Sequence, residues 1–499
     1  MPGSTDFYLN GASWLHRLGT DPANDKIVFQ VGEGPDYQPV EGDIPYMATS
    51  LRGGWIVGVH YRNQEDLPLV YVTREADLLA GRPAWRKVAG HEAGVADVAV
   101  DGDHVYLMAR GRQGAGEIVR VEAASQTFET GTVVVPAGDA VLNYMIVARD
   151  ALYAQHLKDG QGRLSRLTPD GTLTPIILPQ TGSIWGAMAN TREDGLWFQM
   201  DDLTRPPSSY RLEAGADRPR PVSLSQPSPF DVDQFVTTRT DIRARDGAMV
   251  PVEILHRRDA PRDGSNPLLI QAYGAYGIIP DPGYQPPTLA FLEAGGVFVY
   301  AHVRGGGEKG RAWHMAGYKA SKANTWRDAI DCAEGLIAAG WTRKGSVALW
   351  GISAGGIMVG RAITERPDLF AAAIGEVGVF NPVRMELTSN GPGNDAEFGT
   401  VKKEDEFHAL LAMDAYHALK DGVAYPPVLT LTGANDKRVE PWQVGKFTAR
   451  LQAASTNRPG AILRVDYDSG HFANTKAAGN AKRADIFAFV LAHTRARPG

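Results

Sequence analysis

Residues 351–355, with the sequence GISAG, place a serine between small residues at a spacing that suits a nucleophile. The apolar run at 347–350 predicts a strand that leads into this segment, and residues 356–363 predict a helix that leaves it. A strand, a strained turn with serine at its tip and a helix make up a nucleophile elbow. The sequence therefore predicts that Ser353 attacks a carbonyl carbon.

A serine hydroxyl needs a base to take its proton as it attacks. His471 lies in the loop 469–472, directly after the predicted strand LRVDYD, and Asp436 lies in the loop 434–438, directly after the predicted strand VLTLTG. Catalytic groups of a parallel sheet gather at the carboxyl ends of its strands. We therefore expect His471 to be the general base and Asp436 the acid that orients it, in the chain order Ser, Asp, His that accompanies this elbow.

The attack produces a negatively charged oxygen, which must accept hydrogen bonds. The backbone N–H of Ala354, the residue after the nucleophile, is expected to be one donor. A second donor should come from a loop that follows an earlier strand. The segment QAYGAYG at 271–277 is the candidate.

From about residue 231 onward, predicted strands alternate with predicted helices, which indicates a largely parallel sheet covered by helices on both faces. The strand candidates are LLIQAY, VFVYAHV, SVALWG, AAAIGEV, PVLTLTG and ILRVDYD, and the helices lie around 324–340, 354–366, 441–454 and 478–496. Residues 231–499 are thus expected to form an α/β domain that carries the chemistry.

Residues 1–230 follow a different pattern, of short strands separated by turn residues. Four units recur at about 45–90, 95–136, 141–179 and 184–224, and residues 13–31 resemble the end strands of another unit. Repeats of about 40–50 residues with four short strands each favour a β-propeller. We expect residues 1–230 to form a propeller of about four to five blades.

The composition limits the function classes. A chain of 499 residues exceeds one ordinary core, and its net charge of −6 argues against a nucleic-acid-binding protein, which usually carries a basic patch. The sole cysteine, Cys332, excludes a disulfide framework and is expected to be a buried helix residue.

No apolar run approaches the roughly 18 residues of a membrane span, and the first residues do not have the pattern of a signal peptide. We expect a cytoplasmic protein that uses no metal and no organic cofactor.

Several motifs resemble those of the prolyl oligopeptidase family of serine peptidases. Residues 304–308, RGGGE, followed by Gly310, Trp313 and His314, are similar to a signature of that family. The resemblance implies an α/β-hydrolase domain preceded by a seven-bladed propeller that restricts access to short peptides. It also implies Ser353, Asp436 and His471 as the triad.

The same resemblance suggests further site residues. It implies that a tyrosine hydroxyl joins the oxyanion hole, with Tyr273 as the better match and Tyr276 as the competing register. It places Arg438, expected to bind a substrate carbonyl, and Val439 in the substrate site.

The loop at 390–399, NGPGNDAEFG, departs from the prolyl-specific members of the family. Asn394 stands where those enzymes have a tryptophan that stacks on the substrate proline, so proline specificity is not implied. Phe398 is expected to line the S1 pocket. Asp395 and Glu397 are the side chains able to favour basic residues there, as in oligopeptidase B, with ordinary surface positions as the alternative.

The chain is also shorter at its start than members of the family, which suggests an incomplete propeller and leaves a periplasmic location open. The expected partners are short peptides, without nucleic acid or membrane, and the expected assembly is a monomer or a dimer. The sequence leaves two alternative functions open. One is an esterase or acylaminoacyl hydrolase that uses the same triad. The other is a propeller-based binding protein with an impaired hydrolase domain.

Overall fold

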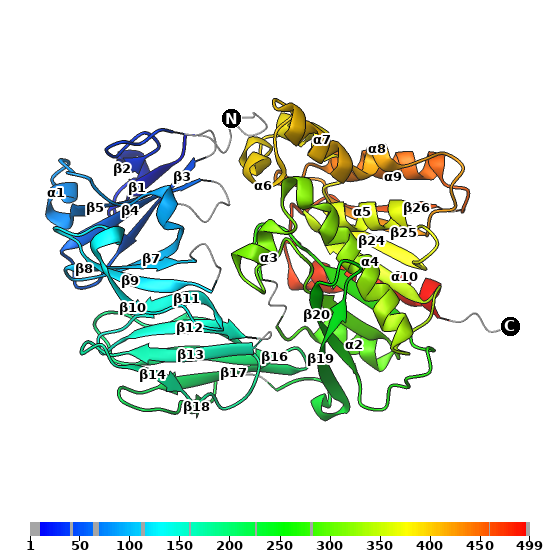
Figure 1. Cartoon of the computed structure of the whole chain (residues 1–499), viewed down its shortest axis with the longest axis horizontal. Helices are drawn as coiled ribbons and strands as arrows, with labels where there is room; N and C mark the ends of the chain where they lie inside the picture. Colours follow the sequence, from blue (N-terminus) through cyan, green and yellow to red (C-terminus); the bar gives the residue numbers. More distant parts are fainter. Residues whose placement is uncertain are drawn as a thin grey trace.

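The computed structural model describes residues 10–39, 43–62, 69–110, 115–158, 161–224, 227–279, 283–458 and 460–495. Two parts lie side by side, one built of small antiparallel sheets and the other of a single large sheet with helices (Figure 1). The predicted combination of an all-β propeller-type part and an α/β part is confirmed.

The first part contains four-stranded antiparallel sheets at the places where the sequence predicts repeats. The first blade is β3 (Asp43–Thr49), β4 (Trp55–Arg62), β5 (Leu69–Arg74) and β6 (Arg86–Ala89), with the short helix α1 (Glu75–Leu79) after β5. The second is β7 (Val95–Asp101), β8 (His104–Ala109), β9 (Glu117–Glu122) and β10 (Thr132–Val135). The third is β11 (Val141–Val147), β12 (Leu152–Lys158), β13 (Gln161–Leu167) and β14 (Leu173–Ile176). The fourth is β15 (Ser183–Met188), β16 (Leu196–Asp202), β17 (Arg205–Leu212) and β18 (Arg220–Val222).

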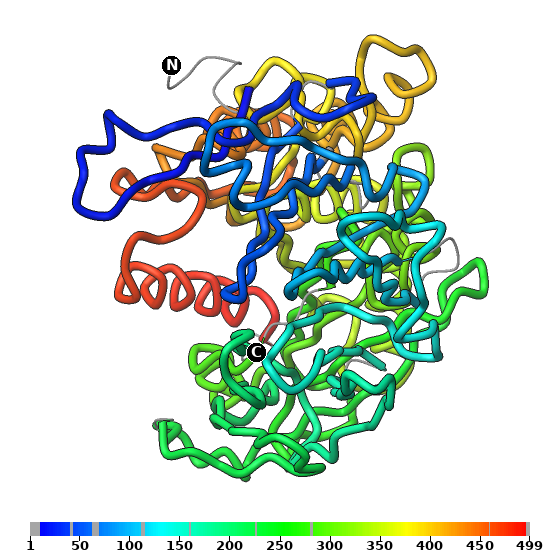
Figure 2. The backbone as a smooth tube through the Cα atoms, turned by 90° about the vertical axis from the view of Figure 1, so that its left-hand side faces the viewer, coloured from blue at the N-terminus to red at the C-terminus, as the bar shows by residue number. Residues whose placement is uncertain are grey.

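Two further strands, β1 (Ala12–Leu15) and β2 (Lys26–Gln30), pair as an antiparallel ribbon, as the predicted end strands of another unit. The blades follow one another in an arc from blue through cyan to green (Figure 2). A separate apolar cluster fills the space between each pair of neighbouring blades. The core of this part is therefore divided among the blade interfaces.

The second part is built on an eight-stranded sheet in the order β19-β20-β22-β21-β23-β24-β25-β26. Its strands are β19 (Phe235–Arg243), β20 (Met249–Arg257), β21 (Leu268–Ala272), β22 (Val297–Ala301), β23 (Val347–Ile352), β24 (Ala372–Glu376), β25 (Val428–Gly433) and β26 (Ala461–Asp466). The six strands from β21 to β26 are parallel and match the six predicted strands. The sequence reading missed β19 and β20, which pair antiparallel.

Helices cover both faces of this sheet. They are α2 (Pro286–Glu293), α3 (Arg311–Met315), α4 (Ala323–Ala338), α5 (Gly355–Glu365), α6 (Asp395–Phe398), α7 (Glu404–Met413), α8 (Ala415–Ala418), α9 (Pro441–Ala454) and α10 (Lys476–Thr494). Alternate strand residues face opposite sides. On β23, Leu349 packs in the cluster that includes α4, α5 and α9, while Trp350 packs in the cluster that includes α2 and α10. Cys332 is fully buried on α4, as predicted.

The fourth blade contacts the second part through the carboxylates of Asp201, which is buried, and Asp202, which is half-buried. Asp201 Oδ2 accepts a hydrogen bond of 2.8 Å from the backbone N–H of Tyr284. Asp202 Oδ2 lies 3.4 Å from Arg239 Nη2, and Arg239 is also paired with Glu253 at 2.7 Å. These contacts fix the last blade against the edge of the sheet formed by β19 and β20.

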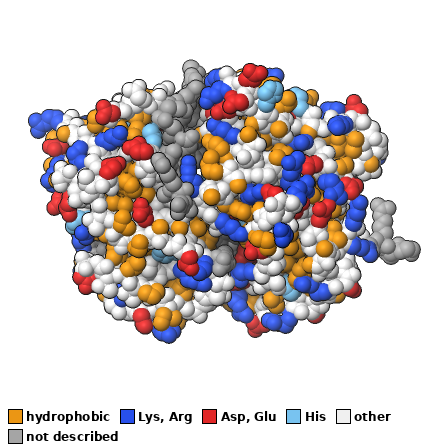
Figure 3. Space-filling view, in the orientation of Figure 1, with side chains coloured by type: hydrophobic (Ala, Val, Ile, Leu, Met, Phe, Trp, Pro, Cys, Tyr) orange, Lys and Arg blue, Asp and Glu red, His pale blue; other side chains and the backbone are white. Residues whose placement is uncertain are grey.

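Charged side chains of both signs are mixed over the face of the molecule seen in Figure 3. Among the helices that the structure describes, none has the length and apolar character to cross a membrane.

Candidate active site

Ser353 lies at the sharp turn between β23 and α5. Its φ is 56°, a left-handed conformation that is unusual for a residue with a side chain. Its N–H donates to the Glu376 carbonyl at 2.8 Å, and its carbonyl accepts from the Val379 N–H at 2.9 Å. A Cβ at Gly351 would lie 2.2 Å from the Gly355 carbonyl oxygen, so this close turn requires glycine there. The strained turn is held by β24 and presents the hydroxyl above the sheet.

His471 bridges the serine and a carboxylate. Its Nε2 lies 3.1 Å from Ser353 Oγ, and its Nδ1 lies 2.7 Å from Asp436 Oδ2. Both contacts lie within the distance expected of a nucleophile, a base and an orienting acid. The structure thus brings together three side chains that are separated by 83 and 35 residues in the sequence.

Asp436 is itself held in place by the loop that carries it. Its side chain is fully buried, and Oδ1 accepts hydrogen bonds from the N–H groups of Arg438 at 2.9 Å and Val439 at 3.0 Å. One carboxylate oxygen therefore binds the backbone while the other faces His471. This arrangement holds the carboxyl group in the orientation that fixes the tautomer of the imidazole.

Two groups beside Ser353 are placed to donate to an oxyanion. Ala354 stands at the N-terminal end of α5, where backbone N–H groups are free of intrahelical partners. The Tyr273 side chain lies close to that of Ser353. Burial raises the pKa of Tyr273, which keeps its hydroxyl protonated as a donor. The Tyr276 hydroxyl instead donates to Asn394 Oδ1 at 2.7 Å, so the geometry favours Tyr273 over the competing register.

Arg438 and Val439 follow Asp436 in the same loop but differ in exposure. Val439 is buried, whereas Arg438 is exposed. The Arg438 guanidinium lies close enough to Tyr273 and Tyr276 to oppose the rise that burial causes in the pKa of both phenols. Arg438 thus offers a positive charge near the two tyrosines of the oxyanion loop.

The loop proposed for the S1 pocket is more enclosed than the sequence suggested. Asn394 is buried, and its amide is already used, because Nδ2 donates to the Asn390 carbonyl at 2.5 Å and Oδ1 accepts from Tyr276. Phe398 has no exposed area and packs against Tyr276, with ring centroids 5.3 Å apart. These placements argue that Phe398 supports the pocket from behind rather than lining it.

Glu397 is not available as an S1 acid. It is only 2% exposed, and its carboxylate is bonded to His314 and to the Tyr276 N–H. This corrects both readings from the sequence, that of a basic-specificity side chain and that of an ordinary surface residue. The sequence reading named His314 only as part of a motif and missed Lys322. The segment 393–398, GNDAEF, also contains Asn394 and Asp395, so nothing in its local sequence distinguishes Glu397 as a buried acid.

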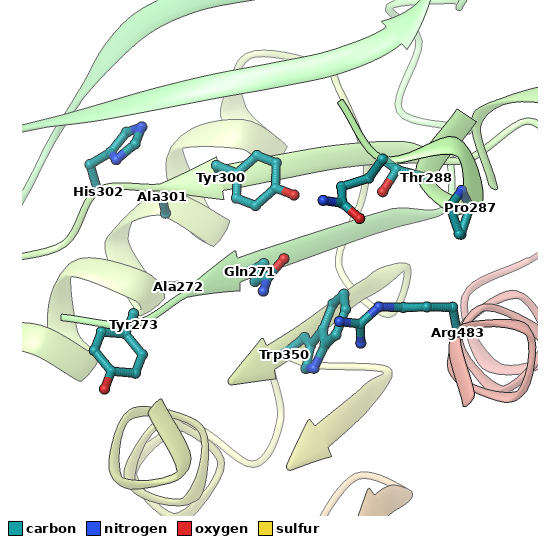
Figure 4. A pocket seen from close by; sticks show the side chains of 11 residues that line it. Gln271, Ala272, Tyr273, Pro287, Thr288, Tyr300, Ala301, His302, Trp350 and Arg483 are labelled. Atoms are coloured by element: carbon teal, nitrogen blue, oxygen red, sulfur yellow. The ribbon is translucent and has the colours of Figure 1, made fainter. Parts of the chain in front are cut away.

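A cavity of about 310 Å³ adjoins the site. Tyr273 and His302 lie at one end, and Trp350 and Arg483 lie toward the other (Figure 4). Arg483 stacks over Trp350 at 4.4 Å and is paired with Glu376 at 2.8 Å. The cavity extends along the sheet face covered by α2 and α10. The described residues, in this cavity or outside it, hold no group of three or more His, Cys, Asp or Glu side chains arranged to bind a metal ion.

Two family models match this chain. The model of the prolyl oligopeptidase N-terminal β-propeller domain matches residues 5–224, and the model of the prolyl oligopeptidase family matches residues 284–497. The chain belongs to the prolyl oligopeptidase family. The resemblance inferred from the motifs is therefore confirmed.

Prolyl oligopeptidase relatives align with nearly the whole chain. The prolyl endopeptidase of Elizabethkingia meningoseptica is 26% identical over 481 residues, which cover 96% of this chain and 66% of that protein. The dipeptidyl aminopeptidase BI of Pseudoxanthomonas mexicana is 26% identical and covers 94% of this chain and 58% of its own length. The chain thus spans just under two thirds, or less, of the length of these relatives.

Solved structures of the prolyl oligopeptidase family show the same architecture. A prolyl endopeptidase structure matches with a TM-score of 0.89 at 27% identity, covering 97% of this chain and 70% of the other. Oligopeptidase B from Leishmania major matches with a TM-score of 0.85 at 22% identity, covering 96% and 68%. The second match supports the fold alone.

Proposed function

We propose that this protein is a serine peptidase that hydrolyses peptide bonds of short oligopeptides. The observation that carries the proposal is the position of His471, which lies 3.1 Å from Ser353 Oγ and 2.7 Å from Asp436 Oδ2. Membership of the prolyl oligopeptidase family supports peptides as the substrate class.

In this proposal Ser353 Oγ attacks the scissile carbonyl carbon while His471 Nε2 takes the hydroxyl proton. His471 then gives that proton to the departing amine, which leaves an acyl-serine ester. A water molecule, deprotonated by His471, attacks the ester, and the proton returns to Ser353 as the acid product leaves. Asp436 does not take up this proton and stabilises the imidazolium at both steps.

Ala354 N–H and the Tyr273 hydroxyl are assigned to the oxyanion hole. The proximity of the Tyr273 and Ser353 side chains supports this role, because the phenol lies beside the oxygen that forms the new bond. Arg438 is assigned to a substrate main-chain carbonyl, which its exposed guanidinium can reach. Val439 and Asn394 are assigned to the walls of the substrate-binding site, with Phe398 packed behind them.

Cleavage after proline is one P1 preference to test, since relatives of this chain are named prolyl endopeptidases. Asn394 offers no ring for stacking on proline, and its amide groups are bonded within the protein. We therefore propose a P1 preference set by the size of the pocket rather than by aromatic stacking or by a negative charge.

We further propose that residues 1–230 and 231–499 act as two domains, the first limiting access to the second. A small gap between the two parts is lined by Leu142 and Asn143 of the third blade and by Gly277 and His314 near the oxyanion loop. The narrowness of this gap between the blades and the oxyanion loop supports a role for the blades in restricting substrate size. The proposal places the protein in the cytoplasm, with the periplasm as the alternative, as a monomer or a dimer.

The test is hydrolysis of fluorogenic peptides that carry Pro, Arg, Ala, Phe or Glu at P1, by the wild type and by Ser353→Ala. Cleavage that depends on Ser353 supports the peptidase. Hydrolysis of aryl esters or acylated amino acids, without cleavage of any longer peptide, would favour the esterase or acylaminoacyl hydrolase. Failure of a fluorophosphonate to label Ser353 would contradict the proposal and favour a binding protein with an impaired hydrolase domain.

A further inference from the structure

Glu397 forms the centre of a buried charged cluster behind the candidate active site. Its Oε2 lies 2.7 Å from His314 Nε2, and its Oε1 lies 3.6 Å from Lys322 Nζ. Lys322 is only 1% exposed. A buried carboxylate and a buried ammonium persist together because each offsets the cost of removing the other from water. Within the described part of the chain, neither group forms a hydrogen bond or ion pair with Ser353, His471 or Asp436.

The cluster binds the backbone of the oxyanion loop at two points. Glu397 Oε1 accepts from the Tyr276 N–H at 2.8 Å, and Lys322 Nζ donates to the Gly274 carbonyl at 2.5 Å. The Gly274 carbonyl lies one residue after Tyr273 in the chain, and the Tyr276 N–H lies three residues after it. Tyr276 has a φ of 61°, a left-handed conformation that costs energy for a residue with a side chain. The Glu397 hydrogen bond therefore holds a strained part of the loop.

The two points of attachment depend on each other. Burial lowers the pKa of Lys322, and the charge of Glu397 opposes that effect. Without the carboxylate charge, Lys322 would be a buried cation without an anionic partner and would release its proton more readily. A neutral amine donates more weakly than an ammonium to the Gly274 carbonyl. Loss of the charge on Glu397 should thus loosen both attachments of the loop.

We propose that Glu397 is a positioning residue that holds Tyr273 in place as the oxyanion donor, acting through the Tyr276 N–H and through Lys322. The inference rests on the proposed peptidase function and on the role assigned to Tyr273. Glu397 touches neither the substrate nor the reacting atoms. Its effect is therefore expected on the chemical step rather than on substrate binding.

A double-mutant cycle tests this inference with a substrate that the wild type cleaves. Glu397→Gln retains an oxygen acceptor and removes the charge, and we expect it to lower kcat by about 10- to 100-fold, since small misplacements of reacting groups have effects of this order. KM should change by less than about threefold, because the contacts that bind the substrate equally in the ground state and the transition state are retained. In a Tyr273→Phe background, the same Glu397→Gln change should alter kcat by less than about twofold. A purely structural role for Glu397 would lower kcat equally in both backgrounds and would overturn the proposal.

Glu406→Gln is the matched control. Glu406 accepts a hydrogen bond of 2.9 Å from the Thr400 N–H and pairs with Lys319 at 3.1 Å, but none of these residues is in the oxyanion loop. This variant should keep kcat within about twofold of the wild type. If it lowers kcat as much as Glu397→Gln, the specific role of Glu397 is refuted.

If Glu397→Gln does not fold, as judged by circular dichroism, the same cycle is run with His314→Gln, which removes the imidazole from the other carboxylate oxygen. An effect on kcat that disappears with Tyr273→Phe supports the proposal, and an additive effect overturns it. Labelling of wild-type Ser353 by a fluorophosphonate distinguishes a failure of the peptidase assignment from a failure of the positioning role. Absence of labelling contradicts the peptidase itself, whereas labelling with an additive cycle contradicts only the positioning role.

Discussion

Arg52 Nε donates to the Thr191 carbonyl at 2.9 Å and so joins the first blade to the fourth. The same guanidinium donates to Asp101 Oδ2 in the second blade at 3.1 Å, and to the carbonyl of Arg149, which follows β11 in the third blade, at 3.0 Å. One side chain thus has a partner associated with each of the other three blades. A planar guanidinium has the several fixed donors that this arrangement needs.

Replacing Arg52 should therefore destabilise the N-terminal part. We expect Arg52→Ala to lower the free energy of unfolding by about 1–2 kcal/mol, because its hydrogen bonds are partly exposed to water. Arg52→Lys should recover only part of this loss, since an ammonium cannot reach three separate acceptors. Urea unfolding measures the effect. Arg82→Ala, at an exposed arginine of the same blade, is the control and should have little effect.

Ser353→Ala should abolish peptide hydrolysis while leaving the fold intact. Loss of the nucleophile is expected to lower kcat/KM by at least about 10⁴-fold. The melting temperature should stay close to that of the wild type, because alanine must adopt the same left-handed turn as serine. Turnover near the wild-type rate in the purified variant would contradict the assignment of Ser353.

Tyr273→Phe should slow the chemical step and spare binding. Loss of one oxyanion donor is expected to lower kcat by about 10²-fold, with KM nearly unchanged. Tyr276→Phe removes only the hydrogen bond to Asn394 and should have a much smaller effect on kcat. Steady-state kinetics with one substrate compares the two variants. The opposite ranking would transfer the donor role to Tyr276.

Arg438→Ala should weaken substrate binding. The guanidinium is exposed and would contact the substrate main chain in both ground and transition states, so we expect KM to rise by about tenfold with a smaller change in kcat. Lys437→Ala, at the neighbouring exposed cation, controls for the loss of a positive charge. Equal effects of the two variants would indicate a general electrostatic contribution instead of a specific contact.

His302 should make stability fall at alkaline pH. Burial lowers the pKa of His302, but its interactions with the Glu253 and Glu308 carboxylates raise the pKa to about 10. A pKa above that of the unfolded chain means that the stabilisation is complete below about pH 6.5 and is lost as the pH rises through about 10. Urea midpoints between pH 6.5 and 10 should therefore fall more steeply for the wild type than for His302→Gln. Parallel curves would show that His302 is not protonated in the folded protein.

The parts of the fold that repeat a simple pattern were predictable from the sequence. The strands β21 to β26 are short apolar runs that each end in a turn, and the blades recur at a regular spacing. The placement of Ser353, His471 and Asp436 followed from the same rule, because each lies in the turn or loop that follows the carboxyl end of a parallel strand. Local sequence was sufficient for these features.

Features that depend on contacts between distant segments could not be predicted in this way. Glu397 pairs with His314, 83 residues away in the sequence, and with Lys322, and nothing local to the loop indicates either partner. The strands β19 and β20 mix apolar with polar side chains, such as those of Arg239 and Glu253, whose ion pair becomes visible only in the folded sheet. The enclosure of Phe398 likewise results from packing by the oxyanion loop.

The separate apolar clusters between blades have a consequence for motion. No single core runs through the described residues of the N-terminal part, because each cluster joins only two neighbouring blades. One blade interface can therefore loosen on its own, at a free-energy cost below that of global unfolding. The apolar clusters on the two faces of the eight-stranded sheet include only one blade residue, Leu203 in the turn between β16 and β17 of the fourth blade. We therefore expect that opening of the interfaces among the first three blades leaves the alignment of His471 with Ser353 unchanged.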